Sequence, residues 1–177
     1  IADELGARIT DILVTTGNTN LVPHGTGTFA SRTSVLSSGA AMLAARELRA
    51  RMTRVAAFLL DGPPEEIQVA NSGFFLPRND RRLTFVELAK ALYSQMGRVP
   101  AEFREDLNVT KSYDPIFGTT SSSTHMALVE VDPVTFAVEI KRYVLAEDCG
   151  RIINPLIVDG QARGAVAQGV GAALFEE

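Results

Sequence analysis

The residues with the clearest capacity for chemistry lie in GTGTFASRTSVLSSG, residues 25–39. Gly25, Gly27 and Ala30 match the G-x-G-x-x-G/A spacing of a dinucleotide-binding loop. In that motif the glycines follow directly on a first strand, and an acidic residue ends a second strand about 20 residues further on. Here eight residues separate the loop from the nearest strand-like run, and Glu47 falls in the middle of a predicted helix. The spacing therefore argues against a nicotinamide or flavin site.

The same stretch retains a capacity to bind an anion. Ala30 to Ser34 precede or begin a long predicted helix, where unpaired backbone N–H groups and the helix dipole favour negative charge. Ser31 and Thr33 add hydroxyl groups, and Arg32 adds a guanidinium suited to phosphate. Alternatively, Ser31 or Thr33 serves only as the N-cap of the helix. The residues alone leave both interpretations open.

Other residues of catalytic type are isolated. His24 and His125 are the only histidines, and neither has a cysteine or carboxylate at the spacing of a metal site. Cys149, between Asp148 and Gly150, has no base nearby in the sequence, so we predict a buried, inert thiol. There is no G-x-S-x-G nucleophile motif. These residues indicate neither an acid–base pair nor a covalent catalyst, and no metal ligands.

Composition excludes several classes of protein. The net charge of -4 argues against a general nucleic-acid binder, because phosphate binding needs a basic surface. No apolar run reaches the ~18 residues of a membrane span. A single cysteine excludes an internal disulfide and fits a reducing, cytoplasmic location. The 177 residues begin without Met and end within a helical pattern, so we expect a piece of a longer polypeptide rather than a processed complete protein.

The elements that must position the anion-binding stretch begin with a predicted strand at residues 11–16, DILVTT. A helical pattern starts near Arg32 and ends at DGPP, residues 61–64. Its single apolar stripe comprises Ala41, Ala44, Ala45, Leu48, Met52, Val55 and Leu59. Four arginines lie off that stripe: Arg46, Arg49, Arg51 and Arg54. They suggest phosphate binding, but a solvated helix face is the more common reason for such a pattern.

Two further elements are predicted in the middle of the chain. Residues 67–77, IQVANSGFFLP, favour a small hairpin turning between Asn71 and Gly73. Thr84-x-x-Glu87 matches a capping box that begins a second helix. That helix is expected to end at Gly97.

The last third of the chain carries the strongest hairpin pattern. Residues 117–125 predict a loop, and the segments HMALVEV and AVEIKRYVLA predict strands joined by a turn at residues 132–135. Asn154 is suited to an N-cap and Pro155 to a first helical turn, so a helix should follow.

This final helix is rich in glycine. Gly160, Gly164 and Gly171 lie within about 40° of one another around the helix axis, although each costs up to ~1 kcal/mol relative to alanine. Such a stripe is expected where another backbone or a flat ligand approaches closely. Gln161 and Gln168 flank the stripe and offer amide donors and acceptors to whatever approaches.

Two segments together resemble the large subunit of the molybdenum hydroxylases, the superfamily of xanthine dehydrogenase, aldehyde oxidase and aerobic carbon monoxide dehydrogenase. Residues 25–49 resemble the G-x-GT-x-ASRS helix start of that family. Residues 129–177 resemble its later hairpin, its D-C/V-G-x-x-(I/L)NP connector and its GQ-x-x-G-x-x-x-QG-x-G helix. The opening DILVTTGNT is similar to the family's V-x-V-x-x-GDT strand.

The resemblance implies a partial molybdopterin-binding domain, residues 1–177, within a longer large subunit. We expect an α+β (mixed α/β) fold, in which long helices pack on a small mixed sheet, with a C-terminal β-hairpin and a glycine-rich helix. By position, the residues expected to bind the pterin and its phosphate region are Ala30, Ser31, Arg32, Thr33 and Ser34. Gln161 is expected to hydrogen-bond the pterin.

The resemblance also implies an activity and its partners. The family oxidises an aldehyde, an N-heterocycle or carbon monoxide with oxygen from water, using molybdenum held by molybdopterin, often as its cytosine dinucleotide. Electrons pass to [2Fe-2S] clusters and FAD on a small and a medium subunit, and a dimer of heterotrimers is expected. The partners are these subunits and a small-molecule substrate, with no nucleic acid and no membrane span.

This sequence also departs from the family pattern. Thr33 replaces the usual Ser and keeps the hydroxyl, whereas Asn18 replaces the usual Asp. The glycine-rich motif with the glutamate that acts as the base lies downstream in the family and is absent here, so residues 1–177 alone are expected to be inactive. The alternative hypothesis is a non-catalytic remnant or interaction module that binds no cofactor.

Overall fold

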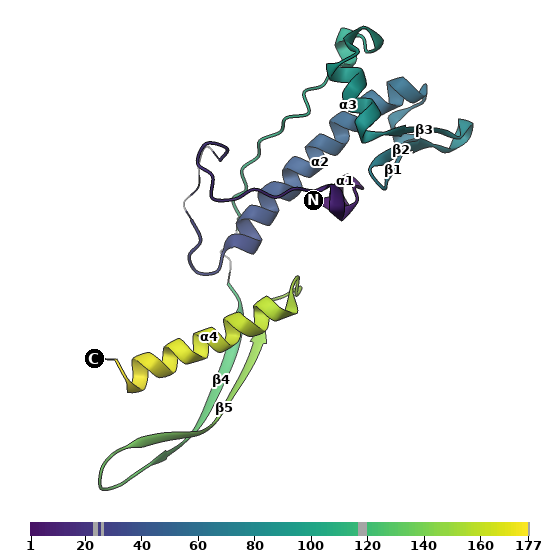
Figure 1. The fold of residues 1–177 in the computed structure, drawn as a ribbon. Helices are drawn as coiled ribbons and strands as arrows, with labels where there is room; N and C mark the ends of the chain where they lie inside the picture. Colours follow the sequence, from purple (N-terminus) through teal and green to yellow (C-terminus); the bar gives the residue numbers. More distant parts are fainter. Residues whose placement is uncertain (23–24, 26, 117–119, 177) are drawn as a thin grey trace. The chain divides into compact units, whose positions relative to one another are not determined.

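The residues that the computed structural model describes are 1–22, 25, 27–116 and 120–176 (Figure 1). The chain divides into two compact units, Ile1–Phe117 and Gly118–Glu177. The first combines helices with a three-stranded sheet, and the second combines a β-hairpin with a helix. The α+β class predicted from the sequence is therefore confirmed.

The first unit contains α1 (Ala2–Leu5), α2 (Thr33–Leu60), β1 (Gln68–Ala70), β2 (Gly73–Leu76), β3 (Arg81–Thr84) and α3 (Phe85–Tyr93). The second contains β4 (Ser122–Val131), β5 (Val138–Asp148) and α4 (Pro155–Leu174). The short 3₁₀ turns are Ile9–Asp11, Pro64–Glu66, Pro77–Asn79, Met96–Arg98 and Ala101–Phe103. No helix in the described part of the chain is long and apolar enough to cross a membrane.

The predicted long helix is confirmed as α2, and its apolar stripe faces the core of the first unit. Ala45, Met52 and Val55 of the stripe are buried, while its other members are half-buried. The core also includes residues from α1, the sheet, α3 and the segment after it. Its buried side chains are Leu5, Ala45, Met52, Val55, Ala56, Ala57, Leu60, Ile67, Phe74, Leu76, Leu88, Ala91, Leu92 and Val99.

The end of α2 is fixed by backbone geometry and by arginine. The predicted stop at residues 61–64 is confirmed, because α2 ends at Leu60 and Asp61 adopts a left-handed conformation, φ 58°. The Arg81 guanidinium donates to the carbonyl oxygens of Leu59 and Leu60 at 3.0 and 2.9 Å. Because the last carbonyls of a helix have no partner within it, these bonds satisfy them and complement the negative end of the dipole.

The four arginines of α2 lie on the solvated side of the helix, as predicted, with Arg46 and Arg54 exposed, and they also hold neighbouring segments. Arg46 pairs with Glu4 at 2.9 Å and anchors α1. Arg54 pairs with Glu105 at 2.6 Å, and Arg51 donates to the Asp106 carbonyl at 2.7 Å. A guanidinium offers five donors, which suits it to bind chain segments that pass alongside the helix.

The predicted hairpin is confirmed as β1 and β2, which pair antiparallel around Asn71 and Ser72. Both turn residues take positive φ, 52° and 59°, as a two-residue turn with the twist of its strands requires. The sequence did not predict β3, which pairs antiparallel with β2 and places Leu83 opposite Phe74. The sheet has the order β1-β2-β3 and is antiparallel throughout.

The capping box at the start of α3 is confirmed. Thr84 Oγ1 accepts from the Glu87 N–H at 3.2 Å, and Glu87 Oε2 accepts from the Thr84 N–H at 2.8 Å. The predicted end at Gly97 is wrong, because α3 ends at Tyr93. The backbone N–H groups of residues 94 and 95 both donate to the Lys90 carbonyl, which closes the last turn there.

The strand predicted at residues 11–16 does not form. Residues 12–16 have no regular structure, and Leu13 and Val14 are 91% and 68% exposed. A strand needs the backbone donors and acceptors of a neighbour, and no strand pairs with this run in the described part of the chain. The β-branched residues of this run alone were therefore not enough to form a strand.

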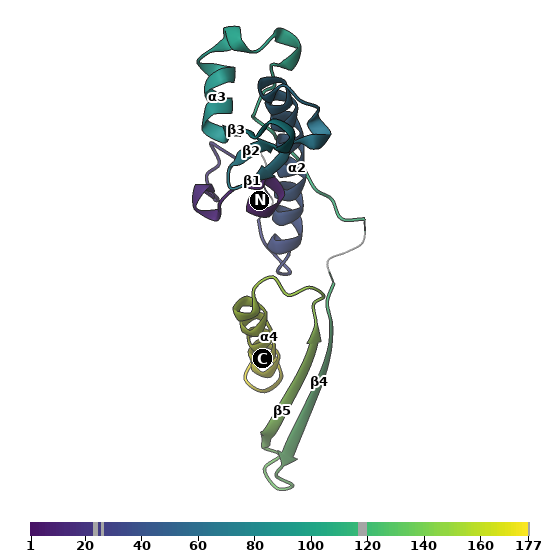
Figure 2. The same cartoon turned by 90° about the vertical axis from the view of Figure 1, so that its right-hand side faces the viewer.

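The second unit confirms the predicted hairpin and helix. β4 and β5 pair antiparallel from Ser122↔Asp148 to Val131↔Val138, and Figure 2 shows them side by side with α4 next to them. Of the loop predicted at residues 117–125, residues 117–119 lie outside the described residues, and 122–125 belong to β4 instead. Asn154 Oδ1 accepts from the Leu156 N–H at 3.1 Å, so its predicted capping role is confirmed.

Candidate functional site

The loop before α2 has an unusual backbone. Ala30 and Ser31 both take positive φ, 51° and 52°, although neither is glycine. The Arg32 N–H donates to the Phe29 carbonyl at 3.4 Å and closes the turn. Left-handed backbone at a non-glycine residue costs about 1–3 kcal/mol and is concentrated at functional sites. Because Asn71 and Ser72 take the same conformation in the β1–β2 turn, the backbone here shows a tight turn before α2, and any functional role depends on the side chains around it.

Arg32 is fixed within this loop by two kinds of contact. Its Nη2 and Nε donate to the Gly27 carbonyl at 2.9 and 3.3 Å. Its guanidinium carbon lies 3.6 Å from the centroid of the Phe29 ring. The hydroxyls of Thr28 and Thr33 also hydrogen-bond across the turn. The loop is thus held by its own side chains.

The first turn of α2 has the chemistry of an anion site. Arg32 is the N-cap residue and its side chain makes no capping hydrogen bond, so the interpretation of Ser31 or Thr33 as the N-cap is wrong. Ser31, Thr33 and Ser34 are exposed, Arg32 is half-buried, and the turn holds no acidic residue. Hydroxyls, a guanidinium and the positive end of a helix dipole together fit a phosphate group.

Gln161 lies in the first two turns of α4 and its side chain is exposed. A Cβ built at Gly160 or Gly164 would meet no atom within 4 Å, whereas one at Gly171 would lie 3.1 Å from Glu176 Oε1, so the stripe is open to an approaching group at Gly160 and Gly164, the part beside Gln161. The loop residues belong to the first unit and Gln161 to the second. The predicted joint binding of one pterin by both stays a prediction.

The remaining residues of catalytic type are two histidines and one cysteine. His24 lies outside the described residues. His125 Nε2 lies 3.0 Å from Ser123 Oγ, and His125 Nδ1 lies 3.0 Å from the Tyr143 hydroxyl oxygen. The second contact links β4 to β5. The prediction of a buried thiol at Cys149 is wrong, since this residue is exposed. It lies in the connector after β5, and no described residue of the second unit is buried there to cover it. No group of metal-binding side chains occurs among the described residues.

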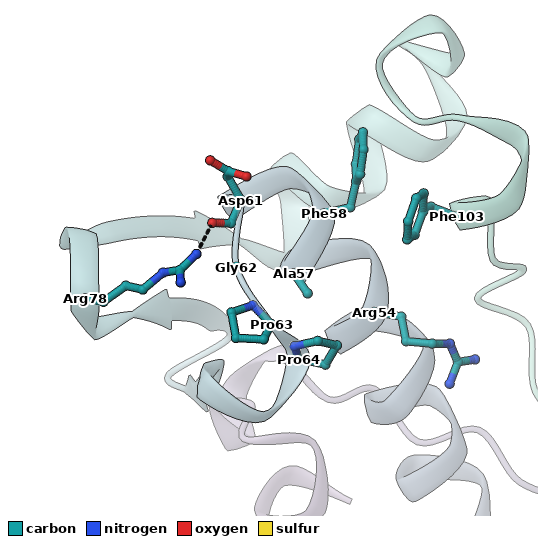
Figure 3. Close-up of a pocket in the computed structure, with 9 residues that line it drawn as sticks. All are labelled: Arg54, Ala57, Phe58, Asp61, Gly62, Pro63, Pro64, Arg78 and Phe103. Carbon is teal, nitrogen blue, oxygen red and sulfur yellow. Dashed lines mark hydrogen bonds between the residues drawn. The ribbon is translucent and has the colours of Figure 1, made fainter.

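A pocket of about 470 Å³ lies at the far end of α2 and was not predicted (Figure 3). Its lining residues are Arg54, Ala57, Phe58, Asp61, Gly62, Pro63, Pro64, Arg78 and Phe103. Phe58 stacks on Phe103 at 4.7 Å, and Arg78 donates to the Asp61 carbonyl at 2.6 Å. A helix of 28 residues is about 40 Å long, so this pocket is remote from Arg32.

The carboxyl groups with shifted pKa values have structural partners. A hydrogen bond from Arg46 holds the pKa of Glu4 below its usual range. Hydrogen bonds from Ser72 and Arg8 likewise lower the pKa of Asp11. These groups join the N-terminal segment to α2 and to the β1–β2 turn, so they contribute to stability rather than to proton transfer.

The sequence matches the molybdopterin cofactor-binding domain family over residues 1–177. It is 38% identical over 178 residues to the nicotine 6-hydroxylase large subunit of Paenarthrobacter nicotinovorans. That alignment covers 99% of this chain and 22% of the nicotine 6-hydroxylase large subunit. It is 30% identical to the carbon monoxide dehydrogenase large chain of Hydrogenophaga pseudoflava over 100% of this chain and 22% of that protein. The chain thus spans about a fifth of these relatives.

The fold is also similar to a solved structure. Quinoline 2-oxidoreductase from Pseudomonas putida 86 superposes with a TM-score of 0.74 and is 33% identical, covering 96% of this chain and 22% of that one. Similarity of sequence and of fold therefore agrees over nearly the whole chain.

Proposed function

This chain belongs to the molybdopterin cofactor-binding domain family, and from that premise we propose that residues 1–177 are part of the large subunit of a molybdenum hydroxylase. The single observation that carries the proposal is the family match over the full length of the chain. This chain spans 22% of each of these two relatives, so we infer a longer polypeptide in which these residues form part of the cofactor-binding domain.

We propose that the start of α2 holds the phosphate end of the cofactor. The hydroxyls of Ser31, Thr33 and Ser34 and the guanidinium of Arg32 supply donors, and the backbone turns at Ala30, where φ is 51°. The absence of acidic residues from the first turn of α2 supports this role, because a carboxylate there would repel phosphate.

Gln161 is proposed to hydrogen-bond the pterin through its side-chain amide. The open glycine stripe beside it supports this role, because a flat ring system can approach a helix most closely where side chains are missing. When bound, the cofactor would supply the redox chemistry of molybdenum for a hydroxylation with oxygen from water. These residues would bind and orient it.

The finer assignments are proposals as well. We propose the cytosine dinucleotide form of the cofactor, FAD and [2Fe-2S] clusters on a medium and a small subunit, a dimer of heterotrimers and a cytoplasmic location. An N-heterocyclic ring is the proposed substrate class, ahead of an aldehyde or carbon monoxide. The 38% identity to a protein named nicotine 6-hydroxylase supports that order.

The test uses the full-length protein purified with its partner subunits. Arg32→Ala and Gln161→Ala should each lower molybdenum and pterin per protein, while thermal unfolding changes little because neither side chain belongs to the core. Arg82→Ala is the matched control, since Arg82 also contacts a phenylalanine ring, at 4.9 Å, but lies in β3. Full cofactor content in both variants would contradict the assigned sites.

Two further measurements test the wider proposal. A wild-type complex that contains no molybdenum after expression with molybdate would favour the non-catalytic interaction module instead. Turnover of nicotine or quinoline by the complex, compared with an aldehyde and carbon monoxide, tests the substrate class. Oxidation of carbon monoxide alone would overturn the preference for an N-heterocycle.

A further inference from the structure

We propose that Phe29 is a positioning residue that fixes the Arg32 guanidinium at the start of α2 for the cofactor. The inference rests on the proposed function, in which Arg32 binds the phosphate region. Phe29 itself offers no polar group to a phosphate, so it would act only through Arg32. Its contribution can therefore be measured separately from that of Arg32.

The geometry gives Phe29 this role. The guanidinium carbon of Arg32 lies 3.6 Å from the centroid of the Phe29 ring, well within the ~6 Å range of a cation–π contact. The Gly27 carbonyl accepts from Nη2 at 2.9 Å and from Nε at 3.3 Å. The ring fixes one face of the guanidinium and the carbonyl fixes one edge, so together they define its plane.

The strained backbone explains how the two side chains meet. Phe29 precedes Arg32 by three residues, and the left-handed conformations of Ala30 and Ser31 turn the chain so that the ring and the guanidinium stack. The Phe29 side chain is 62% exposed, so the ring is not part of the core of the first unit. Its contact with Arg32 is the ring interaction that Phe29 makes in the described part of the chain.

The expected benefit is pre-organisation. A guanidinium already held in one plane loses less side-chain freedom when it binds a phosphate. A cation–π contact at an exposed site is worth about 0.5–1 kcal/mol, which corresponds to about a two- to fivefold change in an equilibrium constant. Loss of the ring should therefore weaken cofactor retention by about that factor.

The experiment measures molybdenum and pterin per protein during prolonged dialysis of the full-length complex. Phe29→Ala and Phe29→Leu should lose the cofactor about two- to fivefold faster than the wild type. Phe29→Tyr should retain the cofactor as well as the wild type does, because tyrosine keeps the aromatic ring. Phe75→Ala is the matched control, since Phe75 lies 4.9 Å from the Arg82 guanidinium in a similar pair outside the site.

The outcomes separate this inference from the proposed function. Retention by Phe29→Ala at the wild-type level, with faster loss in Arg32→Ala, would overturn only the role of Phe29. Retention of the cofactor by Phe29→Leu at the wild-type level would show that the size of the side chain, and not its aromatic ring, holds Arg32. That result would also overturn the proposed role of the Phe29 ring. Unchanged retention in Arg32→Ala would overturn the roles of both Phe29 and Arg32, because the cofactor would not depend on the group that Phe29 holds, and it would leave the family assignment intact.

Discussion

The two units of this chain differ in how they are stabilised. In the first unit, α2, α3 and the three-stranded sheet enclose a core, and every buried apolar side chain among the described residues lies between Leu5 and Val99. In the second unit, no described residue is buried, and apolar residues such as Met126 and Leu128 are 67% and 62% exposed. The hairpin and α4 are held mainly by local hydrogen bonds.

The difference teaches which unit can fold by itself. A two-stranded hairpin without a covered apolar face is marginally stable in water, whereas a helix packed on a sheet supplies the burial that offsets chain entropy. We therefore infer that the first unit is an independent folding unit. The second unit presents the surface expected of a part that is completed by other polypeptide or by a ligand.

The largest expected effect comes from separating the units. Residues 1–117 alone should unfold cooperatively in urea, whereas residues 118–177 alone should show no cooperative transition, because no described residue of the second unit is buried to couple its local structure. Circular dichroism during a urea titration of each piece makes the measurement. A cooperative transition in residues 118–177 would break the comparison between the units.

Core truncation should produce the next largest effect. Phe74 is 1% exposed and packs on Phe85 with ring centroids 5.1 Å apart. Phe74→Ala should lower the free energy of unfolding of residues 1–177 by about 3–5 kcal/mol. Leu128→Ala, at a side chain that is 62% exposed, should change it by no more than about 0.5 kcal/mol. Similar losses in urea denaturation would contradict the claim that only the first unit has a core.

Glycines in the two long helices should respond in opposite ways. A Cβ at Gly39 of α2 would overlap the Tyr113 ring, whereas a Cβ at Gly164 of α4 would meet nothing within 4 Å. Gly39→Ala should therefore destabilise residues 1–177 by about 1–3 kcal/mol, and a second change, Tyr113→Ala, should relieve the overlap. Gly164→Ala should instead raise helicity in circular dichroism. Equal losses of stability in Gly39→Ala and Gly164→Ala would show that another group already contacts the glycine stripe of α4.

Features determined by close neighbours could be predicted from the sequence. The capping groups of Thr84 and Asn154 find their partners within three residues, so the residue types were sufficient. The Asp132 carboxylate likewise accepts from Val134 and Thr135 in the predicted hairpin turn. The helix that begins at Thr33 was also predicted from its pattern, whereas the binding role of the hydroxyls and the guanidinium at its start stays a prediction.

Features determined by distant partners could not be predicted. The run at residues 11–16 has strand-like composition but no strand beside it, whereas β3 forms because β2 offers pairing to Arg81–Thr84. Nothing in the residue types of Ala30 and Ser31 demands the left-handed backbone that brings Phe29 onto Arg32. The exposure of Cys149 depends on the absence of a core in the described second unit.

Helix caps test the comparison at a smaller scale. Thr84→Ala should lower the global free energy of unfolding by about 1 kcal/mol, because α3 packs into the core. Asn154→Ala removes an equivalent bond from α4 but should affect only local opening of that helix. Amide hydrogen exchange separates the two responses. A global effect of Asn154→Ala would mean that α4 is coupled to the core of the first unit.

Acid should have the smallest effect, and it should act mainly through the first unit. Asp11 accepts from Ser72 Oγ at 2.6 Å and from Arg8 Nε at 3.0 Å, and these bonds lower its pKa below the ordinary value of 3.8. A carboxyl whose pKa is lower in the folded state stabilises the fold above its unfolded pKa and loses that contribution as the pH falls through the folded value. The free energy of unfolding should therefore decrease below about pH 4.

Asp132 provides the matched test in the second unit. Backbone N–H groups of Thr135 and Val134 lower its pKa in the same direction as that of Asp11. The second unit lacks a core, so protonation of Asp132 should loosen its turn without changing the cooperative transition. In urea titrations between about pH 2.5 and 5, Asp11→Asn should flatten the acid dependence and Asp132→Asn should not. Equal flattening by both would show that the two units unfold as one.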